Sequence, residues 1–212
     1  MPSPRSQAGA LSTLAWSNVV FHGVGVVLAW NGMRPGSVAA PLAERMAYLA
    51  DRPAGWVWGW GTWMICTLLL VSFMAVLRSR LPPSPTADLA LMLTAAGMAV
   101  DLLCDVIQIQ ALPLAAAGPD QGALFLILER IAFTGGATVA NGLYTAAVVL
   151  MTLCLRTSGL ATRFAGWATG ISGAAMVLSG LILSPALLQA STGPTIGFYS
   201  LWTVLVARDL RP

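Results

Sequence analysis

Long hydrophobic runs dominate the chain, and short polar segments that carry most of the charges separate them. A helix needs about 20 mostly apolar residues to cross the roughly 30 Å hydrocarbon layer of a membrane. Six segments of the sequence approach this requirement. We therefore predict transmembrane helices at about residues 10–30, 55–77, 89–112, 132–155, 164–183 and 192–207. The last of these is short and contains Pro194, so it is the weakest of the six.

The pattern predicts an all-α integral membrane protein, a six-helix bundle that forms one membrane domain over residues 1–212. Leu42, Met46 and Leu49 recur at helical spacing between the first two spans. Residues 37–50 should therefore form a short amphipathic helix in the first outer loop, lying at the membrane interface or, alternatively, covering a cavity. A cleaved signal peptide is disfavoured because the first apolar run is too long for one.

The composition agrees with a membrane protein, since 57% of the residues are hydrophobic and only 9% are charged. A soluble domain carries roughly 25% charged residues, so a cytosolic enzyme, a disordered chain and a disulfide-stapled secreted domain are excluded. Cys66, Cys104 and Cys154 lie in apolar runs without a CxxC pattern, which indicates buried thiols. The absence of lysine excludes Schiff-base and Walker-lysine chemistry.

The arginines predict the orientation of the chain. If both termini lie on one side, seven arginines flank that side and four flank the other. Basic residues favour the cytoplasmic side, so both termini are expected in the cytoplasm. The heavy use of Ala, Gly and Arg points to a bacterium, which makes the bacterial inner (plasma) membrane the expected location. The seven are Arg5, Arg78, Arg80, Arg156, Arg163, Arg208 and Arg211.

The third span carries polar residues that lipid does not tolerate. Gly97, Asp101, Asp105 and Gln108 share one helix face. An ionised carboxylate in the membrane centre costs about 2.5–3.5 kcal/mol, so such groups face the bundle interior, take a partner or stay protonated. Two carboxylates one turn apart repel each other, so one of them should keep its proton. A shared proton suits proton coupling or general acid chemistry.

Polar residues of the first and fourth spans reach a similar depth. Together with the third span they predict an outward-facing polar pocket inside the membrane, in which Trp63 could stack on a ring or cation. The tryptophans can equally belong to an interfacial aromatic belt. The predicted ligand-binding residues are Asn18, Gln108, Glu129, Arg130, Asn141, Trp60 and Trp63, and the catalytic groups of an enzyme would be Asp101, Asp105 and His22.

Each of these residues also has a purely structural interpretation. Asp105 and Arg130 could form an ion pair at the interface, and Glu129 could be solvated above the membrane. His22 could be a hydrogen-bonded core residue, and the threonines of the fourth span could serve helix packing. The sequence identifies no cofactor and no metal site; His22, Asp101, Asp105 and Glu129 would be the candidate ligands of a divalent ion. Arg45 and Arg52 are expected to be solvated loop charges.

The Gly97, Asp101 and Asp105 spacing resembles the second half of the signature of CDP-alcohol phosphotransferases, which are six-span enzymes. The first half of that signature, DxxDG followed by Ala-Arg, is missing, and the stretch ahead of Gly97 holds Asp88 without a second acid. Half of the carboxylates cannot hold the two metal ions of that family. The chain is therefore not assigned to it.

Three functions remain open. The first is a protein that binds or carries a small molecule, a lipid or a cation, with proton coupling through Asp101 and Asp105. The second is a membrane enzyme that modifies a lipid or isoprenoid, with Asp101 as general acid and His22 or Asp105 as base. The third is a non-catalytic accessory subunit of a membrane complex. Membrane lipid is the expected partner and nucleic acid is not; a homo-oligomer is expected, packed through Gly170, Gly173 and their neighbours.

Overall fold

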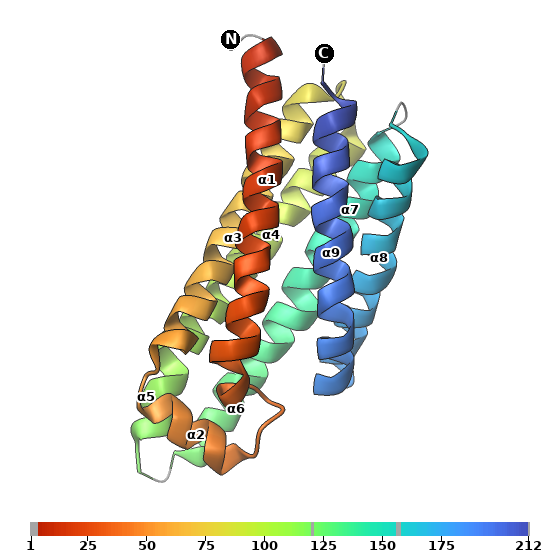
Figure 1. Cartoon of the computed structure of the whole chain (residues 1–212). Helices are drawn as coiled ribbons and strands as arrows, with labels where there is room; N and C mark the ends of the chain where they lie inside the picture. Colours follow the sequence, from red (N-terminus) through yellow and green to blue (C-terminus); the bar gives the residue numbers. More distant parts are fainter. Residues whose placement is uncertain (1–3, 120, 156–157, 212) are drawn as a thin grey trace.

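The computed structural model describes residues 4–119, 121–155 and 158–211, and all regular structure in these ranges is helical. Arg156, one of the arginines counted above, lies outside them. Long helices run side by side in an elongated bundle, and the first and last helices have their outer ends at the same end of it (Figure 1). We call this the terminal end and the opposite one the distal end.

The described chain forms nine α-helices with short π- and 3₁₀-helical turns between some of them. Ser84 and Ser184 cap the helices α4 and α9, each followed by a proline at the first helical position, which is a typical helix start. The elements are α1 (Pro4–Leu28), η1 (Ala29–Met33), η2 (Arg34–Gly36), α2 (Leu42–Ala50), α3 (Ala54–Arg80), α4 (Pro85–Val106), η3 (Ile107–Ala111), α5 (Leu112–Ala117), α6 (Gly122–Thr134), η4 (Gly135–Ala140), α7 (Asn141–Cys154), α8 (Leu160–Leu181) and α9 (Pro185–Asp209).

Five helical segments of the described chain are long and apolar enough to cross a membrane, which fits a multi-pass membrane protein. They are Gly9–Gly36, Ala54–Arg80, Pro85–Ala117, Gly122–Cys154 and Leu160–Leu181. The predicted sixth span corresponds to α9, which has 25 residues but is not among the five. Its serines, threonines, glycines and Pro194 lower its hydropathy.

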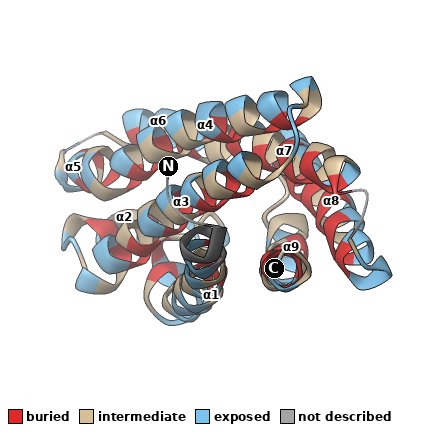
Figure 2. Cartoon of the chain, turned by 90° about the horizontal axis from the view of Figure 1, so that it is seen from above, coloured by how far each residue is buried: buried red, intermediate tan, exposed pale blue. Residues whose placement is uncertain are grey.

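The outer surface of the bundle is apolar. Buried residues face the interior of the helix array and exposed ones point away from it (Figure 2). Large hydrophobic side chains are among the most exposed, including Ile171 at 74%, Met92 at 68% and Leu103 at 61%. Apolar patches of this kind are rare on soluble monomers, and a lipid environment accounts for them.

The neighbours of each helix decide which polar faces can meet. α1 packs mainly against α3 and α9, while α4 packs mainly against α3 and α7. Helix α3 therefore stands between the first and third predicted spans. The largest hydrophobic core fills the terminal half of the bundle, where Phe73 of α3 meets Trp202 of α9 with ring centroids 5.8 Å apart.

Two segments are longer than a membrane requires. Pro85–Ala117 and Gly122–Cys154 have 33 residues each, or about 50 Å at 1.5 Å per residue. Their distal parts, together with α2, extend beyond the α8–α9 hairpin (Figure 1). We call α2, α5 and the first half of α6 the distal layer. A second hydrophobic core joins it to η1 and α3; this core is formed by Met33, Leu49, Trp56, Leu112, Ala115 and Phe125.

Helix α8 approaches the fourth long helical segment closely because glycines face threonines every seven residues. A Cβ atom on Gly173 would lie 2.1 Å from Thr145 Oγ1, and one on Gly166 would lie 2.2 Å from Thr152 Oγ1. The threonine stripe of the fourth span thus serves helix packing here. Gly170 also packs inside the chain, against Val149. Gly170 and Gly173, predicted above as a face for a second copy, are therefore already occupied.

Candidate functional site

Asp101 lies at the centre of a polar contact between three helices. Its Oδ2 accepts a hydrogen bond of 2.6 Å from Thr67 Oγ1 of α3 and one of 3.3 Å from Tyr144 OH of α7. Asp101 itself belongs to α4 and is half-buried. The carboxylate predicted to avoid lipid thus faces the bundle interior, although its neighbours come from α3 and α7 and not from α1.

Asp105, one turn further along α4, is only 1% exposed. Its Oδ2 has no hydrogen-bond partner among the described residues, and the same is true of Gln108 Oε1 and Trp60 Nε1. Helix α3 packs against both α4 and η3, which carry Asp105 and Gln108. Trp56 Nε1 donates to Gln108 O at 2.7 Å, and with the Thr67–Asp101 bond this fixes an antiparallel register in which Trp60 lies opposite Asp105.

The acidic pair lacks a positively charged partner in the described part of the chain. No arginine or histidine nitrogen there lies within 4.0 Å of either carboxylate. A buried charge without a partner is costly, and so is a buried polar atom without a hydrogen bond. The two carboxyl groups, Gln108 Oε1 and Trp60 Nε1 therefore require additional partners, which can be a proton, an ordered water or a bound cation.

Asn18 and His22 belong to a different cluster, on α1, α3 and α9. Tyr199 OH donates to Asn18 Oδ1 at 3.1 Å, and Asn18 Nδ2 donates to Leu69 O at 3.3 Å. His22 Nδ1 lies 2.8 Å from Asn18 O. The imidazole packs against Trp63 and Tyr199, with ring centroids 5.9 and 5.4 Å apart. No hydrogen bond joins His22 to Asp101 or Asp105.

The polar residues that the sequence assigned to the pocket from the fourth span form no hydrogen bond or ion pair with the acidic pair. Asn141 Nδ2 donates to Gly136 O in its own helical segment, at 2.8 Å. Arg130 is exposed and forms no ion pair with Asp105. Glu129 is buried and binds Arg45 at 2.8 Å. The alternative in which Glu129 is solvated and the expectation that Arg45 is a solvated loop charge are wrong, because α2 packs on α5 and brings Arg45 to Glu129 of α6.

The distal layer positions this ion pair through further contacts. Arg45 Nη1 donates to Ala40 O, and Tyr48 OH donates to Gly32 O at the end of the first helix. Burial raises the pKa of the Tyr48 phenol above its ordinary value, so the phenol stays a donor at neutral pH. The Tyr48 bond attaches α2 to η1, and the Arg45 ion pair attaches it to α6. Together they fix α2 at the distal end of the bundle.

Two π-helical segments flank the acidic pair. η3 begins two residues after Asp105 and contains Gln108, and η4 packs against α4 on the other side. η4 can approach α4 closely because Gly135 has no side chain. A Cβ atom on Gly135 would lie 2.5 Å from Cys104 Sγ of α4. π-Helical turns inside α-helices are frequent at functional sites. The Gly135-Gly136 pair is the sequence signal for η4, whereas nothing in the sequence indicates η3.

The described residues hold no group of three or more His, Cys, Asp and Glu side chains that could bind a metal ion.

The structure divides the predicted pocket into three places: the Asp101–Asp105 pair with Gln108 and Trp60, the Asn18–His22 cluster with Trp63, and the Arg45–Glu129 pair. Thr67, Tyr144 and Tyr199 were missed. Each is one of several hydroxyl residues in its helix, and only the packing of the helices gives it these partners.

Comparison with known proteins identifies no relative: no family model, no curated protein and no solved structure matches this chain.

Proposed function

We propose that the chain is a bacterial inner-membrane protein that binds or carries a small cation, exchanging it for a proton at Asp101 and Asp105. The observation that carries this proposal is Asp105 Oδ2, which is buried, has no hydrogen-bond partner in the described part of the chain and lies one turn from a second carboxyl group. A proton satisfies this oxygen in one state, and a cation satisfies it in the other.

The surroundings of the pair favour a cation over a neutral ligand. Asp105 Oδ2 and Gln108 Oε1 are both acceptors, and no described cationic side chain competes for them. The indoles of Trp56 and Trp60 pack edge to face with centroids 5.7 Å apart beside this level. Aromatic faces attract a desolvated cation, so the site suits a monovalent metal ion or a small protonated amine.

The two carboxyl groups have different roles in this proposal. Thr67 and Tyr144 donate hydrogen bonds to Asp101, and donors of this kind favour the ionised form of a carboxyl group. Asp105 receives no such bond on Oδ2, so it carries the exchangeable proton. The enzyme hypothesis has less support, because His22, its candidate base, lies in another cluster.

Proton release on cation binding tests this function. Purified protein in detergent, weakly buffered near pH 7, is mixed with Na⁺, K⁺ or methylammonium chloride while an indicator dye reports released protons. We expect up to one proton per chain with at least one of these cations. Asp105→Asn keeps the shape of the side chain but has no exchangeable proton, so its release should fall to less than a tenth.

Asp88→Asn is the matched control. Asp88 lies on the same helix but is paired with Arg78 at 2.6 Å, and its side chain is 56% exposed. Its release should equal that of the unmodified protein. If none of the three cations releases a proton, or if Asp105→Asn releases as many as the control, the proposal is wrong and the pair only fixes the contact between α3, α4 and α7.

A further inference from the structure

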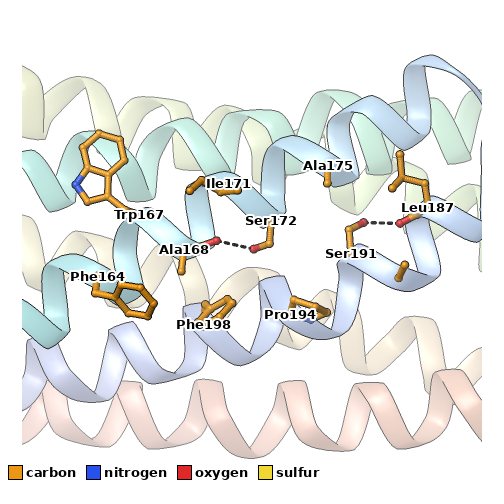
Figure 3. A pocket seen from close by; sticks show the side chains of 11 residues that line it. Phe164, Trp167, Ala168, Ile171, Ser172, Ala175, Leu187, Ser191, Pro194 and Phe198 are labelled. Atoms are coloured by element: carbon orange, nitrogen blue, oxygen red, sulfur yellow. Dashed lines mark hydrogen bonds between the residues drawn. The ribbon is translucent and has the colours of Figure 1, made fainter.

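A groove of about 540 Å³ runs along the surface between α8 and α9, away from the acidic pair. Its two walls face each other across the helix pair (Figure 3). Phe164 and Phe198 form one end of it, with ring centroids 6.2 Å apart. The hydroxyls of Ser172 and Ser191 donate to carbonyl groups of their own helices, Ala168 O and Leu187 O, so the groove is apolar in character (Figure 3).

The length of the groove matches one leaflet of a membrane. Along α8 it extends from Phe164 to Ala175, which is about 16 Å at 1.5 Å per residue. Half of a hydrocarbon layer of roughly 30 Å is about 15 Å. Because α8 runs from Leu160 to Leu181, the groove begins about one turn inside the terminal end of the helix and covers about half of its length. An acyl chain of one leaflet fits this extent.

A second, smaller cavity of about 150 Å³ adjoins the groove and shares Trp167 with it. It lies between the end of α7 and the start of α8, and Arg163 is its one charged lining residue. Arg163 is exposed. The guanidinium group can bind a phosphate group with two parallel hydrogen bonds, and tryptophan is enriched at the depth of lipid head groups.

We propose that these two cavities form one lipid site that takes an anionic phospholipid. One acyl chain lies in the α8–α9 groove, and the phosphate of the head group binds Arg163 at the terminal end. The match of the groove to one leaflet and the position of the arginine at its rim argue for a lipid over a second copy of the chain. This site is separate from the proposed cation site and does not depend on it.

Lipid retention tests the proposal. The protein is extracted with mild detergent, exchanged into equal amounts of phosphatidylglycerol and phosphatidylcholine, and analysed by native mass spectrometry. We expect at least about tenfold preference for phosphatidylglycerol, with one lipid per chain. Arg163→Gln should weaken phosphatidylglycerol binding by about tenfold, because a charged hydrogen bond is lost. Arg211→Gln, an exposed arginine at the same end that lines neither cavity, should change nothing.

Ala175→Phe tests the groove independently, since the larger side chain fills its inner end while Arg163 stays intact. It should release long-chain lipid but still bind dihexanoyl phosphatidylglycerol, whose short chains do not reach Ala175. Equal retention of both lipids by the unmodified protein, or unchanged retention in Arg163→Gln or Ala175→Phe, would overturn the proposal. So would a dimer that Ala175→Phe dissociates, because a second copy would then occupy the groove.

Discussion

Arg45 Nη2 lies 2.8 Å from Glu129 Oε2, and this contact joins α2 to α6 across 84 residues of sequence. The two side chains are only 9% and 10% exposed. A buried ion pair of this kind contributes little in itself, but each charge is costly if its partner is removed. The pair therefore specifies where α2 lies relative to α6.

Arg45→Met should destabilise the fold by about 3–5 kcal/mol, because it leaves the Glu129 carboxylate buried without its cation. The double variant Arg45→Met/Glu129→Leu should be more stable than this single variant, since no charge is left unpaired. Reversible unfolding in mixed micelles measures both values. Glu129→Leu is measured as the second single variant. If the changes in unfolding free energy of the two single variants add up to that of the double variant, the two residues are not coupled.

Gly173→Ala should destabilise the contact between α7 and α8 by about 1–3 kcal/mol, as overpacking does. The new Cβ would lie 2.1 Å from Thr145 Oγ1, so the helices have to separate. Adding Thr145→Ala removes the clashing hydroxyl and should restore most of the lost stability. Gly61→Ala is the control, because nothing lies within 4 Å of a Cβ at that position. The thermal unfolding midpoint in detergent distinguishes these variants, and equal midpoints for both glycine variants would contradict the close contact.

Asp209 should make the stability of the protein depend on pH below about 4. Burial alone would raise its pKa, but hydrogen bonds from Thr162 Oγ1, Gly159 N and the Arg208 guanidinium hold the pKa below its ordinary value. A lowered pKa in the folded state means that this stabilisation is complete above the unfolded value of about 3.9 and is lost as the pH falls through the folded pKa.

Asp209→Asn should therefore be less stable than the unmodified protein at pH 7, and the difference should shrink as the pH falls from about 4 to 2. Unfolding midpoints measured over this pH range test the expectation. Asp51→Asn, which changes an exposed carboxylate of a loop, is the control. A difference for Asp209→Asn that is the same at every pH would show that the carboxylate contributes only through its shape.

Reporter fusions should place both termini in the cytoplasm. The first helix begins and the last helix ends at the same end of the bundle (Figure 1). Both termini on one side of a membrane require an even number of crossings, so this prediction takes α9 as a sixth span beside the five long apolar segments. Green fluorescent protein fused after Pro212 should fluoresce. Alkaline phosphatase should be active when fused after Ala50 and inactive when fused after Leu81. An active phosphatase at the C-terminus would leave only five spans.

Part of this picture follows from local sequence. Hydrophobic runs predicted the long helices, since a helix that crosses a membrane must be apolar along its length. The spacing of Asp101 and Asp105 predicted a polar face on the third span. That inference needed only the periodicity of one helix and the cost of a charge in lipid.

The partners of those residues needed the tertiary structure. The periodicity of a helix tells which residues share a face, but it does not tell which other helix that face meets. Helix α3 lies between α1 and α4, so Asp101 meets Thr67 and Tyr144 while Asn18 meets Tyr199. No local pattern distinguishes this arrangement from the one in which the first, third and fourth spans meet.

The sequence by itself determined the helical membrane character of the chain and the carboxylates that cannot face lipid, because both follow from the transfer of single groups between water and hydrocarbon. Only the tertiary structure decided that Arg45 pairs with Glu129, that the glycines of α8 pack against threonines of the same chain, and that Asp105 Oδ2 finds no hydrogen-bond partner among the residues that the structure describes. These are contacts between segments far apart in sequence, and the packing of whole helices selects them.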